Sequence, residues 1–159
     1  GYAKRDICVK STKQIVETYV DCRKFGCNLL INTGLQGDGT VSPIEERTLA
    51  NIGKWIAYTG EFLYNAVPAK FTADGADVFV DGDDCYVVVK DVPMESNVNV
   101  TRMINGKRTV RLNTNCIISH VEWLDNGKEA ECDGNSIVVA PFDYGTSLGC
   151  RVAKVVFVK

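Results

Sequence analysis

The sequence is poor in the residues that build metal sites. It has a single histidine, His120, and its seven cysteines contain no C-x-x-C pair. A structural zinc site needs four clustered cysteine or histidine ligands. We therefore expect neither a bound metal nor another cofactor, and we interpret His120 as an ordinary strand residue.

Charge and hydropathy argue against two further classes of partner. The 18 basic and 20 acidic residues leave a formal net charge of -2, so nothing favours binding to nucleic acid. No apolar run approaches the ~18 residues of a membrane-spanning helix, and no basic start precedes an apolar stretch as in a signal peptide. We expect no membrane association, and the localisation stays open.

The seven cysteines are odd in number, so at least one thiol is free or forms an intermolecular bond. Free cysteine is among the most buried residue types. We therefore favour small buried thiols that fill core positions, with one or two disulfides as the alternative.

A short apolar run lies between two asparagines in 28–32, Asn-Leu-Leu-Ile-Asn. A half-buried strand would alternate polar and apolar residues, so the unbroken run predicts a strand buried on both faces. Leu29, Leu30 and Ile31 would each gain roughly 1.5–3 kcal/mol from full burial. Such a strand needs neighbours.

Two helices are predicted around this strand. The first covers 11–25 and begins with the spacing of a capping box. The second begins at Ser42, has Pro43 at its first position and ends at Gly60. A glycine-rich loop, 33–41, joins strand and second helix. The order of helix, strand, loop and helix is typical of a parallel α/β layer. The apolar stripe of the second helix consists of Ile44, Leu49, Ile52, Trp55 and Ile56, and we expect Trp55 to be a core residue.

Four pieces of this region, taken in order, resemble a known family. They are Asn28-Leu-Leu-Ile-Asn-Thr-Gly34, Asp38-Gly39-Thr-Val41, Ile52-Gly53-Lys-Trp55-Ile56 and Gly60-Glu61-Phe-Leu-Tyr64. They are similar to the closing segment of the catalytic barrel of α-L-fucosidases, the family 29 glycoside hydrolases. That family has Asn-Leu-Leu-Leu-Asn-Ile-Gly-Pro, then Asp-Gly, then Ile-Gly-x-Trp-Leu and Asn-Gly-Glu-Ala-Ile-Tyr. This chain departs from the pattern with Leu35 in place of proline and Thr59 in place of asparagine.

From about Val67 the pattern changes to short strands separated by turns. The predicted strands are Asp77–Val80, Asp84–Val92, Asn97–Arg102, Arg108–Leu112, Cys116–Trp123, Ser136–Ala140 and Val152–Val158. Asp-Gly and Asn-Gly pairs, the strongest short hairpin signals, lie between them. We predict an α+β fold: a helix-strand-helix unit, 1–66, resembling the end of a (β/α) barrel, followed by an antiparallel β-sandwich of about seven or eight strands, 67–159. The resemblance implies the same sandwich.

The resemblance implies retaining hydrolysis by two carboxylates, one acting as nucleophile and one as acid/base. In the family both come from barrel segments that precede the part matched here, so no catalytic residue is assigned to this chain. Asn32, Gly34 and Asp38 leave the C-terminal end of the predicted strand and would lie nearest a sugar pocket. Tyr2 is a further candidate for the pocket rim. The competing interpretation is that the glycines and Asp38 serve only the turn.

Two hypotheses follow. In the first, the chain is a fragment or truncated relative of an α-L-fucosidase, catalytically incomplete alone, whose complete enzyme acts on fucosylated glycans. The 28–32 strand is then covered by the helices and sandwich, by a barrel, or by a second chain in a homodimer, and we favour self-association. The resemblance alone suggests a secreted, periplasmic or lysosomal enzyme. In the second, the chain is a non-catalytic β-sandwich module that binds carbohydrate or a protein partner.

Overall fold

This computed structural model describes residues 9–97, 99, 106–146 and 149–158, which contain two helices and eight strands. The helices are α1 (Thr12–Lys24) and α2 (Pro43–Asn65). The strands are β1 (Val67–Pro68), β2 (Asp77–Asp81), β3 (Asp84–Val89), β4 (Arg108–Arg111), β5 (Ile118–Trp123), β6 (Cys132–Asp133), β7 (Ser136–Val139) and β8 (Arg151–Phe157). None of the described helices is long and apolar enough to span a membrane.

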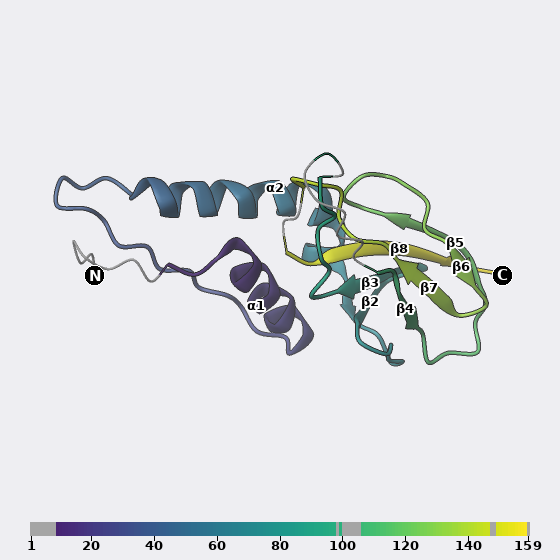
Figure 1. The fold of residues 1–159 in the computed structure, drawn as a ribbon. Helices are drawn as coiled ribbons and strands as arrows, with labels where there is room; N and C mark the ends of the chain where they lie inside the picture. Colours follow the sequence, from purple (N-terminus) through teal and green to yellow (C-terminus); the bar gives the residue numbers. More distant parts are fainter. Residues whose placement is uncertain (1–8, 98, 100–105, 147–148, 159) are drawn as a thin grey trace.

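The strands form two antiparallel sheets that pack against each other (Figure 1). The larger has the order β1-β2-β3-β8-β5 and the smaller the order β4-β7-β6. Their facing sides share one apolar core, which includes Val87 of β3, Val110 of β4 and Ile137 of β7. The predicted α+β fold with an antiparallel sandwich is confirmed.

The two helices cover the other face of the larger sheet. Alternate residues of β3 show this arrangement, because Val87 and Val89 lie in the core between the sheets while Tyr86 and Val88 lie in a second core with the helices. Trp55 of α2 is fully buried in this second core, as predicted. Strand β3 is therefore buried on both faces and contributes side chains to both cores.

Local signals set the start of both helices. Ser11 caps α1, and the complete capping box with Gln14 is present. Ser42 caps α2, with Pro43 at its first position. Both predicted starts are therefore confirmed.

The prediction that the second helix ends at Gly60 is wrong, because α2 continues to Asn65. Glycine inside a helix costs about 1 kcal/mol relative to alanine. Phe62 and Leu63 lie beyond it and are almost fully buried, which is worth roughly 1.5–3 kcal/mol for each side chain. The ring of Phe62 packs edge-on at 4.9 Å from that of Phe79 in β2. Packing on the sheet therefore outweighs the glycine.

The segment 28–32 is not the buried strand that its sequence predicts. It pairs with no strand among the described residues. Leu30 is 81% exposed and Ile31 38% exposed, and only Leu29 packs partly against the helical core. A strand buried on both faces needs neighbours at its edges. The described chain supplies none there, so the expectation that helices and sandwich cover it is wrong.

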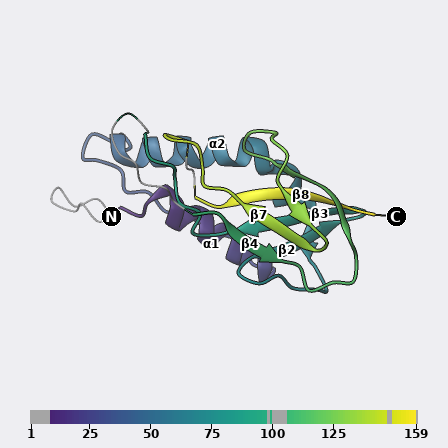
Figure 2. The ribbon, with the colours of Figure 1, turned by 45° about the vertical axis from the view of Figure 1, so that its right-hand side comes forward.

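Most predicted strands appear with small shifts at their ends. Asn97–Arg102 is the exception, because most of it lies outside the described residues. The turn after Asn126 has the expected geometry, with Gly127 at a φ of 66°. The loop between the helices and the end of β8 lie at opposite ends of the molecule (Figure 2).

Ion pairs fasten α1 to the larger sheet. Lys24 at the end of α1 donates to Asp77 in β2 at 2.6 Å, and Lys90 lies 3.0 Å from the other carboxylate oxygen. Lys90 also pairs with Asp21 of α1. Burial raises the pKa of the Asp77 carboxyl, but hydrogen bonds from the two ammonium groups outweigh burial and lower that pKa overall.

The cysteines are less uniformly buried than expected. Cys85 and Cys150 are buried, as the core interpretation predicts, whereas Cys27 and Cys116 are exposed. All six cysteines of the described residues are free thiols. Burial raises the pKa of Cys85 and of Cys150 to about 12.

Candidate functional site

The loop predicted to lie nearest a sugar pocket is a closed turn with its own hydrogen bonds. Leu35 and Val41 form an antiparallel bridge at its base. Within the loop, the N–H of Gln36 donates to the carbonyl of Thr40 at 2.8 Å. The loop therefore has a defined shape without a ligand.

Asp38 lies at the tip of this loop and is exposed. Its carboxylate accepts hydrogen bonds from the backbone N–H and the hydroxyl of Thr40, at 3.0 and 2.7 Å. These bonds hold the pKa of Asp38 below its usual value. The side chain stabilises its own turn and stays ionised.

The other predicted pocket residues lie at the start of the loop. The N–H of Gly34 donates to Glu45 of α2 at 3.3 Å, which joins the loop to the first turn of the helix. Asn32 is exposed just before it. Tyr2, the fourth candidate, lies outside the described residues. The structure thus places Asn32, Gly34 and Asp38 in one loop, with Asn32 and Asp38 exposed and Gly34 half-buried.

Large apolar side chains are uncovered around this loop. Leu30, Leu35 and Ile44 are 81%, 57% and 61% exposed. Ile31 and Leu49 are 38% and 39% exposed. We call these five the uncovered apolar residues. Single exposed apolar side chains are ordinary, whereas a concentration of them marks an interaction site. They belong to the loop between the helices and the first half of α2, which project beyond the sheets (Figure 1).

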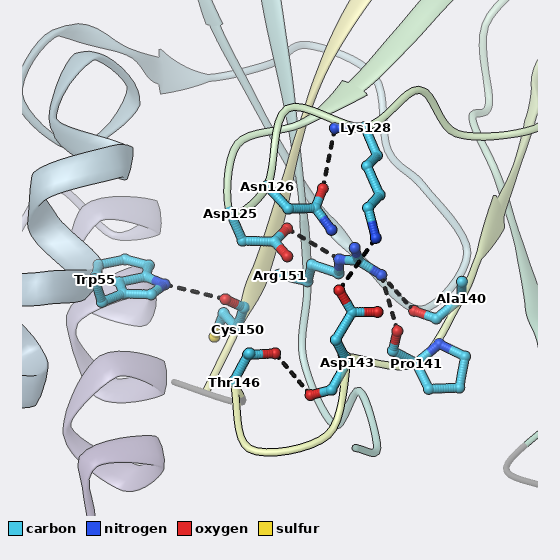
Figure 3. Close-up of polar contacts among 10 residues, drawn as sticks. All are labelled: Trp55, Asp125, Asn126, Lys128, Ala140, Pro141, Asp143, Thr146, Cys150 and Arg151. Atoms are coloured by element: carbon cyan, nitrogen blue, oxygen red, sulfur yellow. Dashed lines mark hydrogen bonds and ion pairs between the residues drawn. The ribbon is translucent and has the colours of Figure 1, made fainter. Parts of the chain in front are cut away.

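A second polar centre, which the sequence does not indicate, surrounds Arg151 at the start of β8 (Figure 3). Its Nε donates to Asp125 at 3.0 Å, and its Nη1 donates to the carbonyls of Ala140 and Pro141 at 2.7 and 3.2 Å. The guanidinium lies 4.3 Å from the ring centroid of Trp123, a cation–π distance. Trp123 is therefore an interior residue.

The Arg151 centre also contacts the helical layer. The indole N–H of Trp55 in α2 donates to the carbonyl of Cys150 at 3.0 Å (Figure 3). Asp125 and Arg151 are 26 residues apart, and no motif or spacing rule pairs them. The one sequence feature that could have indicated this centre is Arg151 itself, a charged residue directly before the apolar strand predicted from Val152 onward.

A hollow of about 190 Å³ opens beside Arg151. Its lining includes Trp123, Asn126 and Lys128. Lys128 pairs with Asp143 at 3.2 Å on the rim. In the part of the chain that is described, no three metal-ligating side chains gather anywhere. His120 instead lies 3.2 Å from Glu129 on the exposed side of β5.

Comparison with known proteins gives a consistent result. Residues 1–61 match the family model described as alpha-L-fucosidase. Over 150 residues the chain is 28% identical to an alpha-L-fucosidase of Branchiostoma floridae. The aligned region is 91% of this chain and 32% of that protein. It is 46% identical to human plasma alpha-L-fucosidase over 52 residues, 33% of the chain and 10% of that protein. The chain thus spans about a third of the Branchiostoma protein.

Solved structures share the fold over nearly the whole chain. Alpha-L-fucosidase isoenzyme 1 from Paenibacillus thiaminolyticus has a TM-score of 0.75 at 20% identity, covering all of this chain and 37% of its own. The Thermotoga maritima alpha-fucosidase has a TM-score of 0.68 at 21% identity, covering 98% and 36%. The resemblance to the C-terminal portion of an α-L-fucosidase is confirmed.

Proposed function

We propose that this chain forms the C-terminal part of an α-L-fucosidase-like hydrolase and is catalytically incomplete alone. The complete enzyme would cleave α-L-fucosyl linkages of fucosylated glycans with retention, using carboxylates from a preceding barrel. The family match and the fucosidase relatives support the hydrolase class. They do not favour the alternative of a non-catalytic module.

The uncovered apolar residues carry this proposal. The segment 28–32 is apolar enough for burial on both faces, yet Leu30 is 81% exposed. Full burial of a leucine or isoleucine side chain is worth roughly 1.5–3 kcal/mol. In a complete barrel, neighbouring strands would supply the backbone hydrogen bonds, and the barrel interior and the outer helices would bury the side chains on the two faces. Asn32, Gly34 and Asp38 would then lie at the C-terminal end of a barrel strand, where barrel active sites are built.

Without a barrel, the same residues favour pairing of two copies. An unpaired extended segment with exposed apolar side chains is a template for another chain. We expect the isolated chain to self-associate and to hydrolyse no fucoside.

The test combines turnover with light scattering on one sample. The purified chain should release no chromophore from a chromogenic α-L-fucoside and should scatter as a dimer. Leu30→Asp should shift the dimer to monomer, because burying an unpaired carboxylate is unfavourable. The control Val158→Asp changes a side chain that is 58% exposed at the opposite end of the molecule and should leave the dimer intact.

Mixing the chain with a separately expressed barrel segment of a fucosidase relative extends the test. Turnover that needs both parts, and that Leu30→Asp weakens more than Val158→Asp does, would support the proposal. Turnover by the chain alone would overturn its catalytic incompleteness. Equal effects of the two aspartates would overturn the assigned surface.

A further inference from the structure

Two of the three guanidinium nitrogens of Arg151 are hydrogen-bonded to described residues. Its side chain is only 4% exposed. Nε is committed to Asp125, and Nη1 to the carbonyls of Ala140 and Pro141. Among the described residues, Nη2 donates to none. A guanidinium carries five N–H donors, so the two on Nη2 are available to a ligand in the hollow that Arg151 lines.

The hollow presents both signs of charge. Its lining has three cations, Lys107, Lys128 and Arg151, and four carboxylates that include Glu131 and Asp143. Lys107 pairs with Glu131 at 2.7 Å, so a donor and an acceptor lie side by side in the lining. An ion of either sign would meet repulsion along with attraction. A neutral ligand whose hydroxyl groups both donate and accept can use both kinds of partner.

The size of the hollow limits the ligand. Its 190 Å³ is below the roughly 300–1,000 Å³ typical of pockets for drug-sized molecules. A single sugar ring suits this space better than a long glycan. Figure 3 shows the side chains of Asn126, Lys128 and Asp143 around the guanidinium of Arg151.

We propose that the hollow beside Arg151 binds one ring of a neutral saccharide, as an accessory site on the sandwich. Arg151 Nη2 and the Asn126 amide would donate to ring hydroxyl oxygens, and the rim carboxylates would accept from ring hydroxyls. This site lies outside the loop 33–41 and goes beyond the proposed hydrolytic role. It needs no barrel, so it can be tested on the 159-residue chain.

The experiment is a titration of the chain with L-fucose, D-galactose or lactose, followed by the indole N–H signals in two-dimensional NMR spectra. The chain has two tryptophans. Trp123 lines the hollow, whereas Trp55 is fully buried and does not line it, so the two indole signals are compared. At least one of these sugars should shift the Trp123 signal saturably, and by more than it shifts the Trp55 signal.

Matched variants test the contact with the amide of Asn126. The Oδ1 atom of Asn126 accepts from the N–H of Lys128 at 3.0 Å, so Asn126→Asp keeps the turn and removes the amide donor. Asn97→Asp is the control, because Oδ1 of Asn97 accepts from the N–H of Asn99 in the same way at 2.9 Å and does not line the hollow. Loss of one hydrogen bond should weaken binding by about 2- to 10-fold in Asn126→Asp and leave Asn97→Asp unchanged.

A second pair of variants covers the cation on the rim. Lys128→Met should weaken sugar binding. Lys13→Met should not, since Lys13 forms its exposed pair with Asp91 elsewhere on the surface. Three results would overturn the site: no saturable shift with any of the sugars, equal losses in the members of either variant pair, or tighter binding of acetate than of the sugars. Fucoside turnover is measured separately, so failure of this site and failure of the proposed hydrolase part are distinguishable.

Discussion

Replacement of Arg151 by methionine removes the residue that joins three parts of the sandwich. Methionine preserves much of the side-chain length but no hydrogen-bond donor. Asp125, whose side chain is 13% exposed, would lose its counter-charge. The carbonyls of Ala140 and Pro141 would lose their donor.

Loss of one partner from a buried ion pair costs about 3–5 kcal/mol. The chain has 159 residues, and for domains of about 150–250 residues each kcal/mol lowers the melting temperature by roughly 2–4 °C. We therefore expect Arg151→Met to melt roughly 6 to 20 °C below the parent. Replacing the unpaired carboxylate of Asp125 with a neutral amide should restore part of the lost stability. The double variant Arg151→Met with Asp125→Asn should therefore be more stable than Arg151→Met alone.

The melting temperature is measured by thermal unfolding followed by far-ultraviolet circular dichroism, and the free energy of unfolding by urea unfolding followed by tryptophan fluorescence. The control is Lys107→Met, which makes the same kind of change in an exposed pair: Lys107 and Glu131 are 54% and 71% exposed. Exposed pairs contribute about 0–1 kcal/mol. If Arg151→Met lost no more stability than Lys107→Met, the structural role assigned to Arg151 would be refuted.

Three further predictions concern the backbone at Gly149, the reactivity of the thiols, and the loss of stability at low pH. Gly149→Ala should destabilise the chain by about 1–3 kcal/mol in urea unfolding, because Gly149 has a φ of 111° and an added Cβ would lie 3.3 Å from Val16. In the native protein at pH 8, peptide mapping after reaction with a thiol reagent should find Cys27 modified and Cys150 intact, since Cys150 is buried and has a pKa near 12. Asp77 has a lowered pKa in the folded chain, so it stabilises above the unfolded value of about 3.9 and this contribution is lost as the pH falls. The stability difference between the parent and Asp77→Asn should therefore be larger at pH 7 than at pH 3, measured as urea midpoints.

Features that depend on neighbours in the sequence could be predicted from the sequence. A cap is set by residues within one turn, as Ser11 and Ser42 illustrate. Strand content follows from β-branched runs between turn signals, and the sandwich accordingly appears where it was expected. The Asp81-Gly82 and Asp133-Gly134 turns join β2 to β3 and β6 to β7, as their sequence predicts.

Features that depend on contacts between residues far apart in the sequence could not be predicted from it. Gly60 has the local properties of a helix end, and only the packing of Phe62 against β2 shows that the helix continues. Arg151 and Asp125 meet because β5 pairs with β8, with Trp123 opposite Ala153, so the residues just after β5 lie beside the start of β8. Neither contact leaves a periodic pattern in the sequence. The exposure of the loop 33–41 follows from glycine content, but its internal hydrogen bonds do not.

The two largest disagreements between apolar pattern and burial belong to the loop between the helices and the first half of α2. In α2 the apolar stripe is continuous, yet Ile52 and Trp55 are buried while Ile44 is 61% exposed. The same contrast holds in 28–32, where Leu29 is partly covered and Leu30 is exposed. In the described sandwich most apolar strand residues are buried, although Val67, Ile117, Val156 and Val158 are 43–58% exposed. The exposed apolar residues of 28–35 and of the first half of α2 support the proposal that a barrel, or a second copy in its absence, covers this surface.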